Sequence, residues 1–108
     1  MKAKLLMREK HIMEDGSILE LVLWQLPKKE KDRSHAYKYR LYYGDSKGNN
    51  LVRYDNESGK GDHKHIGNKE LPYEFINQDT LIKDFQKDIK RCSSKRGDNN
   101  DRTTPNND

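Results

Sequence analysis

Short runs of alternating apolar and polar residues fill the first half of the chain. A spacing of two predicts β-strands, because successive side chains of a strand point to opposite faces of the sheet. Residues 18–26 are apolar at nearly every position, which favours a central place in the sheet for this strand. The predicted strands cover residues 2–12, 18–26, 36–43 and 51–55.

Turn-forming residues separate these runs. Asp15-Gly16 lies between the first two runs and predicts a hairpin, since glycine accepts the positive φ that such turns need. Pro27 ends the second strand because proline has no backbone N–H to donate to a neighbouring strand. Further along, Gly67 and Pro72 predict a loop after the fourth strand.

Near the C-terminus the apolar residues recur every three or four positions instead. This spacing predicts a helix over residues 78–92, with Asn77 as its N-cap. Residues 93–108 contain no aliphatic side chain, so we expect a disordered polar tail. The predicted fold is one α+β domain over residues 1–92, an antiparallel β-sheet of four or more strands with the C-terminal helix packed on one face.

The same alternation divides the predicted sheet into two faces, and a slip of one residue would exchange them. The apolar face, which we expect to receive the helix, holds Leu5, Met7, Val22, Trp24, Tyr39, Leu41 and Tyr54. The opposite, basic face holds Lys4, Arg8, Lys10, Lys38, Arg40 and Arg53.

Charge and composition narrow the class of protein. The 108 residues include 22 Lys/Arg and 18 Asp/Glu, and a basic surface favours a polyanion such as RNA or an acidic protein partner. No apolar run is long enough for a transmembrane helix or a signal peptide. The single cysteine, Cys92, excludes an internal disulfide and a CxxC metal pair. Together these features predict a cytoplasmic protein.

The stretch from Arg53 to His65 concentrates groups that transfer protons or bind phosphate. His63 and His65 would point to one face of an extended segment, and histidine suits acid–base catalysis near neutral pH. Asp62 or Asp55 could fix a histidine tautomer. The stretch therefore suits cleavage of an RNA phosphodiester. The basic residues that would hold the phosphate are Lys60, Lys64, Arg40 and Arg53.

Other interpretations of this stretch stay open. A His-x-His pair can hold zinc or another divalent ion, with further ligands from positions such as His35 or Asp55. The two histidines could also belong to a solvated polar loop with no chemical role. If RNA is the ligand, unpaired bases could stack on tyrosines of the third strand, namely Tyr37, Tyr39 and Tyr42.

These motifs resemble the TumE family, the proposed toxin components of prokaryotic toxin–antitoxin modules. The resemblance extends along most of residues 1–92. It rests first on the central string Tyr54-Asp55-Asn56-Glu57-x-Gly59-Lys60-Gly61-Asp62-His63-Lys64-His65. It also includes Lys4-Leu5-Leu6-x-Arg8-Glu9, Trp24-Gln25-Leu26-Pro27, Tyr37-Lys38-Tyr39-Arg40-Leu41, Pro72-Tyr73-x-Phe75 and Leu81-Ile82-x-Asp84-Phe85.

The resemblance implies a small cytoplasmic toxin encoded beside a TumA-type antitoxin, which is a helix-turn-helix DNA-binding protein. Small toxins of this kind are often ribonucleases, so we expect an RNA endonuclease that needs no metal, no cofactor and no membrane. A homo-oligomer is compatible with the sequence. The alternatives are a toxin that only binds a nucleic acid or protein, and a metal-dependent nuclease or transferase with His63 and His65 as ligands.

The expected site divides into catalytic and substrate-binding residues. The sequence does not assign which histidine is the acid and which the base. The expected catalytic residues are His63, His65, Asp62 and Lys60. The expected substrate-binding residues are Arg40, Arg53, Lys38, Tyr54, Asp55, Asn56 and Lys64.

Overall fold

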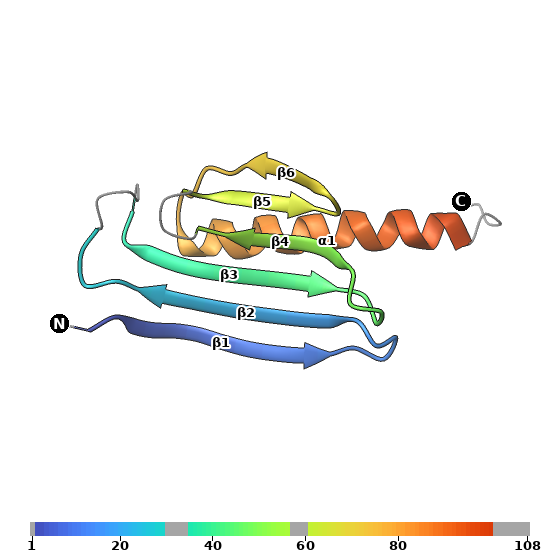
Figure 1. Ribbon diagram of the computed structural model, residues 1–108, viewed down its shortest axis with the longest axis horizontal. Coiled ribbons are helices and arrows are strands. Elements are labelled where there is room, and N and C mark those ends of the chain that lie inside the picture. Colours follow the sequence, from blue (N-terminus) through green and yellow to red (C-terminus); the bar gives the residue numbers. More distant parts are fainter. Residues whose placement is uncertain (1, 30–34, 57–60, 101–108) are drawn as a thin grey trace.

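The structure is a computed structural model that describes residues 2–29, 35–56 and 61–100. Among these residues, six strands form one antiparallel sheet in the order of the sequence, and one helix follows them and lies on one face, which confirms the predicted α+β class (Figure 1). Within the described residues, no helix is long and apolar enough to cross a membrane. The elements are β1 (Lys4–Ile12), β2 (Ile18–Gln25), β3 (Tyr37–Gly44), β4 (Asn50–Asp55), β5 (His63–Ile66), β6 (Lys69–Pro72) and α1 (Gln78–Asn100).

The first hairpin has the predicted turn. Gly16 has a φ of 87°, in the region that residues with a Cβ rarely adopt. The Met13 N–H donates to the carbonyl of Ser17, and the Asp15 carboxylate accepts from the N–H and the hydroxyl of Ser17 at 2.9 and 2.6 Å. Local hydrogen bonds therefore set the register between β1 and β2.

The prediction of a loop around Gly67 and Pro72 is wrong. Residues on both sides of Gly67 form the hairpin of β5 and β6, and Gly67 supplies the positive φ of its turn. Pro72 is the last residue of β6, at the edge of the sheet, where a missing N–H leaves no gap in the ladder. The histidines consequently lie in a strand and not in a loop. Gly61, just before β5, has a φ of 73°, which bends the chain at the start of this strand.

Helix α1 begins as predicted and ends later. The Asn77 side chain caps it, since Asn77 Oδ1 accepts from the Thr80 N–H at 2.8 Å. The helix continues to Asn100, so residues 93–100 are helical and do not begin the predicted tail. Each added residue extends an established helix at little cost, even without an apolar face. Residues 101–108 of that tail lie outside the described residues.

The core lies between the sheet and α1. Leu21 and Leu23 of β2 face the helix, so Val22 and Trp24 lie on the opposite face, contrary to the prediction. β2 is apolar on both faces, so its pattern did not distinguish them. A register shift between Leu5 and Met7 also exchanges the predicted faces of Lys4 and Leu5. The buried side chains are Leu21, Leu23, Tyr39, Leu41, Tyr43, Val52, Tyr54, Leu81 and Phe85.

Candidate active site

Two rows of side chains cross the sheet on the face opposite α1, which we call the open face. One row pairs Arg40 of β3 with Asp55 of β4, and Asp55 with His63 of β5. The neighbouring row pairs Arg53 of β4 with His65 of β5. Residues that pair across antiparallel strands share a face, so the predicted common orientation of the two histidines is confirmed. Their ring centroids lie 5.1 Å apart.

His63 is buried and lies between two oxygen atoms. Its Nδ1 is 3.0 Å from the carbonyl oxygen of Gly61, and its Nε2 is 2.8 Å from Oδ1 of Asp55. An oxygen atom therefore lies beside each ring nitrogen of His63. Asp55 also pairs with Arg53, with 3.3 Å between Oδ2 and Nε.

His65 lies in a different environment. Burial lowers the pKa of His65 below its ordinary value, and the neighbouring Arg53 guanidinium lowers it further. Its Nε2 is shielded from solvent and has no hydrogen-bond partner among the described residues. The neutral imidazole is therefore the favoured form, and a neutral imidazole nitrogen accepts a proton. The two histidines therefore lie in different environments.

A basic hollow adjoins the histidines. It has a volume of about 430 Å³. Such a space is in the range of small-ligand pockets, although it is open to solvent. Lys38 and Arg40 are exposed, so their cationic groups are available to an anion. The residues that line the hollow are Lys38, Tyr39, Arg40, Arg53 and Asp55.

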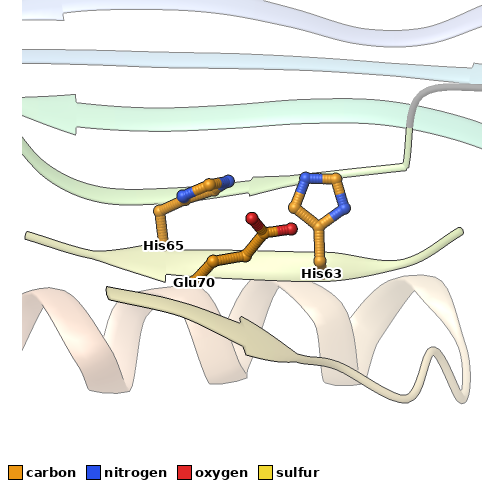
Figure 2. Close-up of side chains that lie close together, drawn as sticks. All are labelled: His63, His65 and Glu70. Carbon is orange, nitrogen blue, oxygen red and sulfur yellow. The ribbon is translucent and has the colours of Figure 1, made fainter. Parts of the chain in front are cut away.

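A carboxylate that the sequence did not indicate joins the two histidines. Glu70 of β6 pairs with His65, and one ligand atom from each of His63, His65 and Glu70 lies within 4.8 Å of the others. Figure 2 shows the Glu70 carboxylate between the two rings. Two imidazoles and one carboxylate form a donor set that zinc accepts. Glu70 was missed because its segment was predicted to be a loop.

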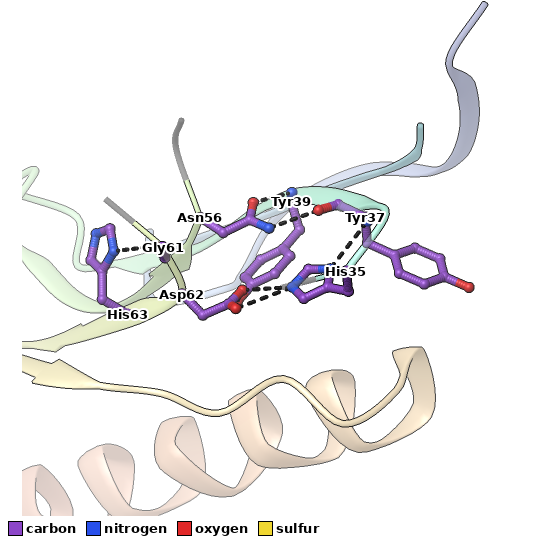
Figure 3. Close-up of polar contacts among 7 residues, drawn as sticks. All are labelled: His35, Tyr37, Tyr39, Asn56, Gly61, Asp62 and His63. Carbon is purple, nitrogen blue, oxygen red and sulfur yellow. Dashed lines mark hydrogen bonds and ion pairs between the residues drawn. The ribbon is translucent and has the colours of Figure 1, made fainter. Parts of the chain in front are cut away.

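Asp62 takes part in a separate network on the other side of the strand (Figure 3). Its Oδ1 accepts from the Tyr39 hydroxyl at 2.7 Å and lies 2.9 Å from His35 Nε2. His35 Nδ1 accepts from the Tyr37 N–H at 3.1 Å, so the proton is on Nε2, which donates to Asp62. His35 also stacks on Phe75. These bonds hold the segment before β5 against β3, and they direct Asp62 and His35 away from His63.

Two expected substrate-binding residues lie on the helix side. Tyr54 is fully buried, and its hydroxyl donates to Asp88 of α1. The Lys64 ammonium lies 3.0 Å from the same carboxylate. Alternation along β4 and β5 explains this arrangement, because each residue is next in sequence to one on the open face. Tyr54 and Lys64 fasten α1 to the sheet. Lys60 lies outside the described residues.

Asn56 extends the pairing of β3 and β4 beyond the last backbone pair. Its Oδ1 accepts from the Tyr39 N–H at 3.0 Å, and its Nδ2 donates to the Tyr37 carbonyl at 2.7 Å. The side chain is almost completely buried, so it supports the backbone and does not reach a substrate.

Replacement of Asn56 by alanine is expected to lower the free energy of unfolding by about 1–3 kcal/mol, because the buried polar groups of Tyr37 and Tyr39 would lose their partner. Urea unfolding followed by circular dichroism measures this loss. The exposed Asn68→Ala variant is the control. Equal stability of the two variants would show that Asn56 has no such role.

The comparisons with known proteins agree with these observations. A family model described as "Toxin TumE" matches residues 2–93, which is most of the chain. No curated protein and no solved structure matches the chain. The matched region contains all six strands, both histidines and the first part of α1. The chain therefore belongs to the TumE toxin family, and this membership implies a cognate antitoxin.

Proposed function

We propose that this toxin is a metal-independent RNA endonuclease that works by acid–base catalysis. The observation that carries the proposal is the pair of histidines on the open face, one with an oxygen atom beside each ring nitrogen and one with a lowered pKa. RNA cleavage by its own 2′-hydroxyl requires one proton acceptor and one proton donor, and histidine serves both roles near neutral pH.

In this proposal the two histidines have different roles. His65 removes the proton of the 2′-hydroxyl, and the resulting oxygen attacks the adjacent phosphorus. The bond from phosphorus to the 5′-oxygen breaks, and His63 donates its proton to that oxygen. The products are a 2′,3′-cyclic phosphate and a free 5′-hydroxyl. Asp55 keeps the ring of His63 oriented through the 2.8 Å contact with Nε2.

The basic residues stabilise the phosphate as its charge increases in the transition state. Arg40 and Arg53 lie beside the histidines, since both pair with Asp55, one across the strands and one through its side chain. Lys38 is exposed beside them in the same hollow. Lys60 stays a predicted contributor.

The direct test incubates the purified full-length protein with total RNA, with and without a chelator, and maps the ends of the products. We expect cleavage that the chelator does not affect, with 2′,3′-cyclic phosphate ends. Growth inhibition without cleaved RNA would contradict the proposal and support a toxin that acts by binding alone.

The pH dependence of cleavage offers a further prediction. His65 acts as a base only when neutral, so activity falls as the pH drops through its pKa, and we expect the midpoint of this fall below pH 6.5. Arg53→Gln removes a cation that lowers this pKa, so the midpoint should move to higher pH. Lys38→Gln is the control, since it should lower the rate without moving the midpoint. An unchanged midpoint in Arg53→Gln would contradict the role of His65.

A metal-dependent nuclease or transferase is the second candidate function, favoured by the position of Glu70 beside the two histidines. In that case His63, His65 and Glu70 would hold a divalent ion, which polarises a phosphoryl oxygen. A chelator and the Glu70→Gln variant would then both abolish activity. Under the acid–base proposal neither does so. Glu20→Gln, on the same face at β2, is the matched control.

The cognate antitoxin is proposed to be a helix-turn-helix protein of the TumA type, acting in the cytoplasm. Its gene is expected next to that of the toxin. Co-expression of the two genes should restore growth, and the two proteins should purify as a complex. Failure of the neighbouring gene product to bind would contradict this pairing.

A further inference from the structure

We propose that the open face binds single-stranded RNA across β2 to β5, with unpaired bases stacked on Trp24 and Tyr42. The proposal rests on the proposed function for the identity of the ligand as RNA. It adds a binding surface away from the reacting atoms. Neither aromatic residue is needed for the acid–base chemistry itself.

Both aromatic residues lie on the same face as the histidines. Trp24 pairs with Lys38, and Tyr42 pairs with Arg53. Neither Trp24 nor Tyr42 is among the side chains that pack against the core. Both are partly exposed. Helix α1 lies on the other face of the sheet, and among the described residues no helix or strand lies over the open face (Figure 1). Large partly exposed aromatic rings on an uncovered sheet face are the platform on which unpaired bases stack.

Tyr42 is held in a particular position by its neighbours. A Cβ atom built on Gly44 would lie 2.0 Å from the Tyr42 hydroxyl, so the ring lies over the space that Gly44 leaves. The Arg40 guanidinium carbon lies over the ring, 5.9 Å from its centroid. The ring thus lies along β3 with a cation over it, so that a nucleotide could place its base near the ring and its phosphate near the guanidinium.

Basic side chains on the strands either side of Trp24 complement a nucleic-acid backbone. Lys38 and Arg40 are exposed on β3, between Trp24 and the histidines. On β1, Arg8 pairs with Val22 and Lys10 with Glu20, so both basic residues face the same side. Phosphates neutralised by such side chains provide most of the affinity for single strands.

The spacing also suits a short single strand. β2 and β5 are separated by three strand intervals, or about 14 Å. A few nucleotides extended across the strands would reach from His63 to Trp24. Bases in a duplex are stacked on each other and are not available to the protein's aromatic rings. The ligand is therefore an unpaired stretch of RNA.

The only tryptophan of the chain is Trp24, which makes its fluorescence a specific reporter. The full-length His63→Ala/His65→Ala variant, which should not cleave, is titrated with a short oligouridylate and with a duplex of equal length. We expect saturable quenching of tryptophan emission by the single strand and little by the duplex. Binding of labelled oligouridylate without any change in emission would overturn the proposal, as would equal affinity for the duplex.

Substitutions give the second measurement. Trp24→Leu and Tyr42→Ala should each weaken binding of labelled oligouridylate by at least about tenfold. Trp24→Phe and Tyr42→Phe should retain it, which separates stacking from a loss of folding. Ile76→Ala, at another exposed apolar residue, is the control. If a folded Trp24→Leu variant binds labelled oligouridylate as the wild type does, the proposed stacking on Trp24 is wrong. If the variants behave as expected and the wild type does not cleave RNA, the platform stands and the proposed endonuclease does not.

Discussion

Replacement of His63 or of His65 by alanine is expected to lower the rate of RNA cleavage by about 10²–10⁴-fold, the usual contribution of one acid or base. His63→Ala removes the proton donor for the 5′-oxygen, and His65→Ala removes the acceptor for the 2′-hydroxyl. Growth inhibition should disappear with cleavage. Gel analysis of a defined RNA, together with survival of cells expressing each variant, measures both effects.

The controls for this prediction are a different histidine and the double variant. His11 is exposed on β1, so His11→Ala should cleave as the wild type does. The double variant is expected to lose less activity than the sum of the two single losses in activation free energy, because the donor and the acceptor act in one step. If the double variant is folded and as toxic as the wild type, the histidines do not carry the activity.

Replacement of Asp88 by alanine is expected to lower the free energy of unfolding by about 3 kcal/mol. This is the lower end of the range for removing one partner of a buried ion pair. Asp88 is 8% exposed and accepts from the Tyr54 hydroxyl. It also accepts from Lys64, with 3.0 Å between Nζ and Oδ2. Its removal leaves two polar groups of the sheet without their partner in α1. Urea unfolding followed by circular dichroism gives the change directly.

Two further variants make the stability experiment specific. Glu74 is exposed just before α1, and Glu74→Ala should change the unfolding free energy by less than about 0.5 kcal/mol. Asp88→Asn keeps an acceptor for the Tyr54 hydroxyl but removes the charge that pairs with Lys64, so its loss should be intermediate. Equal stability of Asp88→Ala and the wild type would mean that these contacts do not fasten α1 to the sheet.

Much of the fold followed from local patterns. Alternating runs predicted the first four strands, Asp15-Gly16 predicted the first turn, and Asn77 predicted the start of α1. The patterns failed where local information does not decide the structure. β2 is apolar on both faces, so only packing against α1 sets its orientation. The strand that carries Glu70 contains few β-favouring residues and forms because β5 offers it a partner.

The site was predicted in part, and strand geometry explains which part. His63, His65, Arg53 and Asp55 follow one alternation, and the structure brings them together. Asp62, Lys64 and Tyr54 were assigned to the site from proximity in sequence, which does not distinguish the faces of a strand. The lowered pKa of His65 depends on burial and on Arg53, and neither effect can be obtained from composition.

The alternation through residues 62–65 has a genetic consequence. Asp62 and Lys64 are bonded to β3 and α1, whereas His63 and His65 face the open side. Cells that survive expression of this toxin would carry two kinds of escape mutation within four codons. Those at 62 and 64 should deplete the protein from the cell, and those at 63 and 65 should leave it abundant but harmless. Immunoblots of survivors would therefore show the toxin absent and present in alternation from one mutated codon to the next.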